Sequence, residues 1–143
     1  MSRPGPARTA REMIAGMTPE LTPGSFIFTT GAPTALAAEA VATVAEDEGL
    51  TMILPAATAV AHGQPGPVMR RITLRVWSSL EGTGLTAAVS SALAAEGIPC
   101  NMVAGYHHDH IYVPEAEADR AIAVLKGLQS KAASNPAIPR NHA

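Results

Sequence analysis

Aromatic residues are scarce in this chain, and their scarcity constrains its core. Phe, Trp and Tyr together make 3% of the 143 residues, whereas 47% of the residues are hydrophobic. A core with so few rings must be packed from Ala, Val, Leu, Ile and Met. The length is enough for one domain of ordinary size, or for two small units that share a core.

Runs of positive charge and pairs of cysteine are absent as well. The net charge is -2 and no basic run is longer than Arg70 and Arg71, so the charge pattern argues against a nucleic-acid partner. Cys100 is the only cysteine, which excludes an internal disulfide and fits a reducing compartment.

Long apolar runs are the third absence. No apolar stretch after Arg3, Arg8 and Arg11 could form the centre of a signal peptide, and no segment approaches the length of a membrane span. We therefore expect a cytoplasmic protein without a membrane partner. Residues 129–143 mix Ser, Asn, Pro and Ala without periodicity and are expected to form a flexible tail.

The first part of the chain contains short segments of alternating type. Apolar patterns and turn residues predict a short helix at 10–17, a strand at 25–30, at most a short helix at 33–39, a half-buried strand at 41–46, a strand at 50–54 and a proline-initiated helix at 55–63. Glu48 and Gly49 have the composition of a hairpin turn between the last two strands.

The second part has a clearer pattern. Residues 71–77 alternate apolar and polar side chains, as a strand with one buried face does. The following helix ends at Gly97 and carries one apolar stripe, formed by Leu85, Ala88, Val89, Ala92 and Leu93. Residues 99–105 and 108–113 are predicted to form a hairpin, and Pro114 to open the last helix.

The two parts echo each other. Residues 50–63 and 110–127 both read as strand, proline, alanine-rich helix and glycine. Each part therefore approximates strand, helix, strand, strand, helix. This order predicts an α+β protein with antiparallel sheets and helices on one face, in the ferredoxin-like βαββαβ plan.

The ordered segments ITLRVWS, SLEGTG, AAEGI, PCNMVAGY and HDHIYVP between residues 72 and 114 resemble the ACT domain, a small ligand-sensing module. The chain is similar to small bacterial proteins with two ACT-like units and to the regulatory ACT domains of aspartate kinases. The resemblance divides it into an N-terminal extension with a short helix (1–24), a degenerate ACT-like unit (25–68), an ACT domain (69–128) and a flexible tail (129–143).

What the resemblance implies is a non-catalytic regulatory or sensing protein that binds a small ligand, expected to be an amino acid, at an ACT–ACT interface. It also implies a homodimer or a higher homo-oligomer, and we expect no cofactor. Aspartate-kinase-like units commonly end this helix with Gly-Ile-Asn, whose backbone contacts the effector. Here Pro99 takes the third position and has no N–H to donate, so Asn101 is the candidate substitute.

The turn before the main helix is the first candidate for ligand binding. Its glycines would let a ligand carboxylate approach the backbone, and the helix N-terminus offers unpaired N–H groups. The alternative is an ordinary helix start with Thr83 as its N-cap. The candidate residues here are Ser79, Glu81, Gly82, Thr83, Gly84 and Leu85.

Asp109 is the second candidate. Strand alternation puts its carboxylate on the same side as Ile111 and Val113, which should face the helices. A carboxylate on an apolar face needs a partner. A ligand ammonium would serve, and so would a neighbouring N–H or Arg75.

The histidines do not indicate a metal site. His108 and His110 share a strand face but supply only two ligands, so we expect no metal, and Tyr112 on that face favours a subunit contact. No nucleophile and base stand out as a set, so no catalytic residue is expected. Two alternatives stay open: a small acyltransferase-type enzyme, suggested by the EGTG turn, and an oligomerisation module without a ligand.

Overall fold

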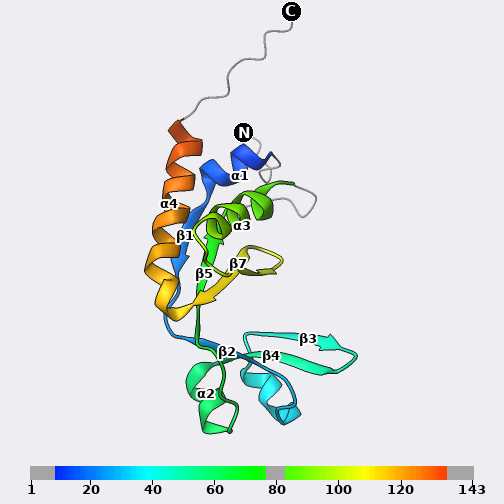
Figure 1. Cartoon of the computed structure of the whole chain (residues 1–143). Helices are drawn as coiled ribbons and strands as arrows, with labels where there is room; N and C mark the ends of the chain where they lie inside the picture. The colour runs from blue at the N-terminus through cyan, green and yellow to red at the C-terminus, as the bar shows by residue number, and fades with distance from the viewer. Residues whose placement is uncertain (1–8, 77–82, 135–143) are drawn as a thin grey trace, which may run out of the picture.

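The computed structural model describes residues 9–76 and 83–134. None of the helices in these ranges is long and apolar enough to cross a membrane. The helices and strands follow one another in the order α1 (Ala10–Gly16), β1 (Thr18–Leu21), β2 (Phe26–Thr29), the 3-10 helix η1 (Thr34–Glu39), β3 (Ala42–Glu46), β4 (Gly49–Pro55), α2 (Ala56–Ala61), β5 (Met69–Arg75), α3 (Leu85–Ala95), β6 (Asn101–Ala104), β7 (Asp109–Pro114), the 3-10 helix η2 (Glu115–Glu117) and α4 (Ala118–Ser134) (Figure 1).

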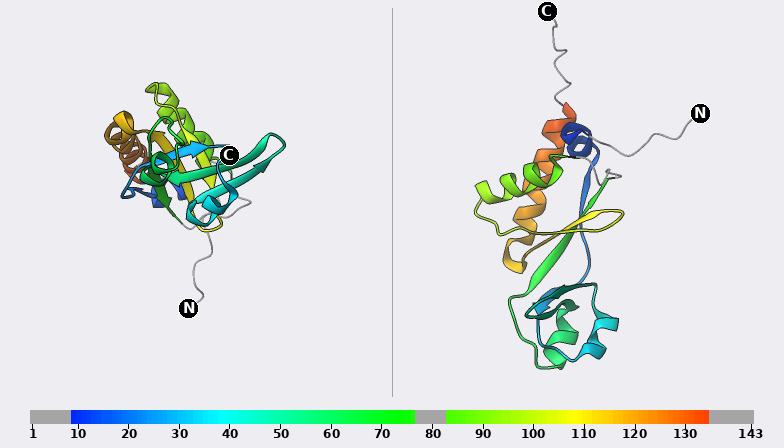
Figure 2. Two further views of the ribbon diagram at one scale, coloured as in Figure 1. Left: turned by 90° about the horizontal axis from the view of Figure 1, so that it is seen from below. Right: turned by 90° about the vertical axis from the view of Figure 1, so that its right-hand side faces the viewer.

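The strands form one antiparallel sheet that divides at a narrow point. Its order is β3-β4-β2-β5-β7-β6, with β1 also paired to β5. β2 meets β5 only where Phe26 lies opposite Met69. We therefore call residues 22–68 the first half and residues 9–21 with 69–134 the second half. Figures 1 and 2 show these halves as two bodies along a common axis.

The N-terminal segment folds with the second half. β1 lies along β5, with Leu21 opposite Ile72, and takes the place beside β5 that the βαββαβ plan gives to a strand after its second helix. α1 packs on α4 and α3 (Figure 1). The residues expected to be an extension (1–24) thus supply, from residue 9, a helix and an edge strand of the second half. The sequence did not predict β1, because Pro19 counts against a strand. β1 pairs with β5 alone, and an edge strand tolerates proline.

The two halves have separate cores of small side chains. In the second half, α1, α3 and α4 cover one face of the sheet around Ile72, Leu74 and Ile111. In the first half, η1 and α2 cover Ile27 and Met52. Neither of these clusters contains an aromatic residue, as the composition predicted.

Aromatic residues gather where the halves meet. Tyr112, on the helix-free face of β7, is 2% exposed and forms edge-to-face contacts with Phe26 and Phe28 of β2, at centroid distances of 5.7 and 5.2 Å. The expectation that Tyr112 marks a subunit contact is corrected, because its ring is buried between the halves of one chain.

Most predicted elements are confirmed to within a few residues, including α1, β2, β4, α2, α3 and the β6–β7 hairpin. The last helix continues past its expected end near Lys126, so residues 129–134, expected to belong to a flexible tail, are helical, and Gln129 donates a hydrogen bond to the carbonyl of Ala15 at 2.8 Å. The strand at 41–46 forms as β3, but it is not half-buried. Only its first residue is partly covered, because β3 pairs with β4 alone at the outer edge of the sheet. Trp77, expected at the end of β5, lies outside the described residues.

Candidate ligand-binding site

The start of α3 has no side-chain cap. Its N-cap position is Gly84, at φ 101° and ψ -20°, and none of the side chains in residues 9–76 and 83–134 forms a cap hydrogen bond there. The alternative of Thr83 as the N-cap is therefore wrong, and Thr83 is exposed. The carbonyl of Gly84 accepts from the N–H of Ala88 at 2.9 Å. The backbone N–H groups before Ala88, in the first turn, have no hydrogen-bond acceptor within the helix. Such groups are suited to binding an anion.

Gly84 also has a structural reason to be glycine. Its positive φ favours glycine, and a Cβ built there would lie 2.5 Å from the Cβ of Ala10 in α1. The start of α3 is thus packed against the start of α1. Leu85 places its side chain in the core of the second half and is 4% exposed. Only its backbone remains available to a ligand.

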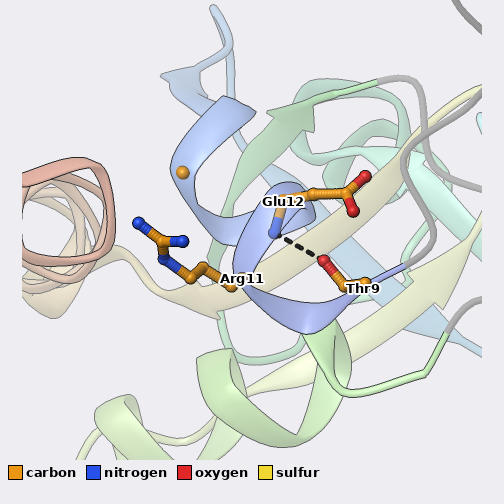
Figure 3. A pocket seen from close by; sticks show the side chains of 4 residues that line it. Thr9, Arg11 and Glu12 are labelled. Atoms are coloured by element: carbon orange, nitrogen blue, oxygen red, sulfur yellow. Dashed lines mark hydrogen bonds between the residues drawn. The ribbon is translucent and has the colours of Figure 1, made fainter. Parts of the chain in front are cut away.

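A hollow of about 440 Å³ lies beside α1, lined by residues that include Thr9, Arg11, Glu12 and Ala15. Thr9 caps α1 by accepting a hydrogen bond from the N–H of Glu12 at 3.1 Å, while Arg11 and Glu12 extend in different directions (Figure 3). Ala10, between two of these lining residues in the sequence, lies beside Gly84 at the start of α3. The volume of the hollow is within the usual range for small-molecule sites. No sequence pattern marked these residues as a site, although T-x-x-E at 9–12 is a capping-box pattern.

Asp109 is the first residue of β7 and lies on the helix-covered face. Its ladder neighbours are Leu74 and Ala104, and Leu74 belongs to the core. Ile111 and Val113 lie in the same core, so the predicted face is as expected. Partial burial raises the pKa of the Asp109 carboxyl, and the nearby His110 and His108 lower it to a smaller extent. Within residues 9–76 and 83–134, no hydrogen bond or ion pair involves this carboxylate.

Arg75 does not neutralise Asp109. It points to the other face of the sheet and forms an ion pair with Glu20 of β1. On that face Thr73 also shares a hydrogen bond of 2.9 Å with Nδ1 of His110. Burial lowers the pKa of His110, and the positive charges of Arg71, His108 and Arg75 lower it further, against the opposing effect of Asp109.

The start of α3 and Asp109 occupy the same end of the second half. Asp109 pairs with Leu74, the penultimate residue of β5. α3 is the next element after β5 and begins at Leu85. Figure 1 shows the start of α3 and the β6–β7 hairpin near the same end of β5, while the right-hand view of Figure 2 shows α3 and the tip of the hairpin extending to opposite sides of this strand. The arrangement offers N–H donors and a carboxylate at one end of one layer.

Asn101 is not brought to this place. Asn101 lies opposite Tyr112 on the helix-free face, at the far end of β6 from Ala104, and its Nδ2 donates to the Tyr112 carbonyl at 3.2 Å. Ser79, Glu81 and Gly82 lie outside the described residues. In the described ranges, no three His, Cys, Asp or Glu side chains are grouped to hold a metal ion.

The fold and this end of the molecule define a class: an α+β protein with an antiparallel sheet, helices on one face and two related halves. Family models described as ACT domain match residues 8–68 and 70–127. The chain belongs to the ACT-domain family. Both its fold and its resemblance to ACT domains are confirmed, and ACT domains are regulatory modules rather than catalytic ones.

Solved structures share this fold. A Vibrio cholerae protein of unknown function, described as a possible transport protein, is 38% identical, has a TM-score of 0.74, and is matched over 82% of this chain and 93% of its own. An Agrobacterium tumefaciens protein is 17% identical, with a TM-score of 0.58 over 79% of this chain and 89% of its own. A Clostridium acetobutylicum aspartate kinase is 8% identical, with a TM-score of 0.52 over 71% of this chain and 26% of its own. The last two show the fold alone. No curated protein sequence matches the chain significantly.

Proposed function

We propose that the protein is a cytoplasmic, non-catalytic sensor that binds a small zwitterion, an amino acid in the first instance, at the end of the second half where Asp109 and the start of α3 lie. Ligand binding would favour one arrangement of ACT units and so change the contact with a partner protein. The family assignment supports the regulatory role, while the ligand and its position are our inference.

One observation carries the proposal: Asp109 places a carboxylate on an apolar face without a partner among the described residues. Partial burial raises its pKa, so the ionised form costs free energy in the unliganded protein. A ligand ammonium would remove this cost. A purely structural carboxylate would be expected to have an internal partner, as Glu20 has in Arg75.

The carboxylate end of the ligand would meet the uncapped first turn of α3. Gly84 has no Cβ to obstruct an approach to the backbone, and the first turn carries the positive end of the helix dipole. A hollow of about 440 Å³ lies beside α1, the helix whose start packs near this turn. A second ACT unit, from another copy of the chain, would close the site.

Open strand edges in the described part of the sheet support a homo-oligomer. β3 and β6 stand at the ends of the strand order, and edge strands with free N–H and C=O groups are suited to pairing with another chain. The same edges favour the second candidate function, an oligomerisation module that binds no ligand. The described structure provides no observation that favours the acyltransferase alternative.

Thermal unfolding in the presence of each standard amino acid tests the proposal. A ligand at one hundred times its Kd stabilises the folded state by about 2.7 kcal/mol, which for a chain of this size raises Tm by on the order of 10 °C. We expect such a rise for one ligand or one chemical class. Asp109→Asn should remove it, because the neutral amide has no charge for the ammonium.

Asp47→Asn is the matched control, since it makes the same chemical change at an exposed turn of the first half. It should leave the ligand-dependent rise intact. If no amino acid raises Tm, while Tm increases with protein concentration, the ligand-free oligomerisation module is supported instead.

A further inference from the structure

The contact between the halves depends on a small set of side chains, which we call the joint: Thr22, Phe26 and Phe28 from the first half, and Met69, Arg71 and Tyr112 from the second. The ladder contributes only one residue pair between β2 and β5. The buried cluster here is small, with Phe26, Ile53 and Tyr112 at its centre. Side chains therefore hold the halves together more than the sheet does.

Arg71 makes the most varied contacts in the joint. Its Nε donates a hydrogen bond to the hydroxyl of Thr22 at 3.1 Å, and its backbone carbonyl accepts from the Thr22 N–H at 2.9 Å. Its guanidinium lies 4.9 Å from the centre of the Phe26 ring, within the range of a cation–π interaction. Phe26 in turn packs edge-to-face on Tyr112.

The neighbouring arginine is less well placed. Arg70 lies on the opposite face of β5 and donates from Nη2 to the Thr22 carbonyl at 3.2 Å. Its Nε is buried without a hydrogen-bond partner among the described residues, which offsets part of the gain from that bond. Arg71 is therefore the arginine whose loss should loosen the joint most.

The first half has little to hold it together by itself. Its own buried core consists of five residues, Ile27, Leu36, Met52, Leu54 and Ala59. Units below about 70 residues rarely gain enough free energy from one core to fold alone without disulfides, metals or a partner surface.

We propose that Arg71 and Tyr112 act as a docking surface inside the chain, on which the first half depends for its folding. The first half is ordered only while Thr22, Phe26 and Phe28 rest on these two side chains. The second half, with its larger core, stays folded when the first half opens. The joint thus sets the local stability of the first ACT unit from outside that unit.

Hydrogen exchange of the full chain, followed by mass spectrometry, tests this proposal. In Arg71→Ala and in Tyr112→Leu, amide exchange in residues 26–61 should accelerate by about tenfold or more, from the loss of a charge-assisted hydrogen bond or of ring contacts. Exchange in residues 85–125 should change by less than about threefold. Both substituted residues belong to the second half, so a selective effect on the first half is the distinguishing result.

Arg75→Ala is the matched control. Arg75 lies on the same strand and face as Arg71, but its partner Glu20 belongs to the second half. It should leave exchange in both regions nearly unchanged, and Arg71→Lys should fall between Arg71→Ala and the natural protein. Equal acceleration of both regions in Arg71→Ala and Tyr112→Leu, or unchanged exchange in residues 26–61, would overturn the proposal. Tyr112→Leu and Arg71→Lys retain the test if Arg71→Ala does not fold.

Discussion

In the second half, three helices cover the sheet and fourteen of the described residues form one buried cluster. In the first half, a 3-10 helix and a six-residue α-helix cover the sheet, and the buried cluster contains five described residues. The two ACT-domain models match segments of similar length, residues 8–68 and 70–127, but the first segment includes α1 and β1, which fold with the second half. Matched segments of similar length therefore do not bring cores of similar size. The half with the larger core also carries Asp109 and the start of α3, so the candidate site is built on the more rigid support.

The largest expected effect comes from removing the same side chain in each core. Leu93 and Leu54 are both fully buried, in the second and the first half respectively. Leu93→Ala should lower the free energy of unfolding of the whole chain by about 2–5 kcal/mol. Leu54→Ala should act on the first half alone. Urea unfolding with hydrogen exchange separates the two outcomes, and a global loss of equal size in both variants would show that the halves unfold as one unit.

The next effect concerns two glycines of the second half. Gly84→Ala should cost about 1–3 kcal/mol, because a Cβ would approach Ala10 at a positive φ. Gly127→Ala should instead stabilise by about 0.5–1 kcal/mol, since Gly127 lies within α4 with no atom near its added Cβ. Thermal unfolding of both variants measures the difference. A stable Gly84→Ala variant would mean that α1 does not pack on the start of α3.

The smallest effect is the pH dependence due to Asp109. Its pKa in the folded protein is raised above the ordinary value of 3.8. Between the ordinary pKa and the raised pKa, the folded state therefore binds more protons than the unfolded state. Stability from this group therefore falls as pH rises through the raised pKa and is recovered on acidification. Asp109→Asn should remove this contribution. Comparing the pH dependence of Tm in the two proteins measures it, and a natural protein that gains nothing relative to Asp109→Asn on acidification contradicts the burial argument.

Periodicity predicted what depends on local pattern. The alternation in β5 and β7 correctly placed Ile111 and Val113 on the helix-covered face, and Gly97 ends α3 at a positive φ of 69° as expected. Periodicity did not predict which residue occupies the N-cap position of α3. Thr83 has the composition of an N-cap, but the approach of Ala10 from a distant helix selects Gly84 for that position.

Contacts between distant segments were the part that the sequence could not supply. Nothing in the residues around Tyr112 indicates that Phe26 and Phe28 would cover it. The hollow at Arg11 and Glu12 lies beside α1, and the local sequence does not indicate that α1 packs with the second half. For the candidate site, the sequence predicted the face of Asp109. Only the fold shows that Arg75 pairs with Glu20 and not with Asp109.

The pairing of β1 with β5 has a consequence for biosynthesis. During translation, α1 and β1 emerge long before the segments they pack on, since α1 contacts α3 and α4, and 49 positions separate Thr22, next to β1, from its partner Arg71 in β5. β1 can pair only after β5 has been translated, and contacts between segments so far apart in the sequence form slowly. A cut after residue 68 would separate α1 and β1 from the half with which they fold. The two matched segments therefore cannot be exchanged as independent units.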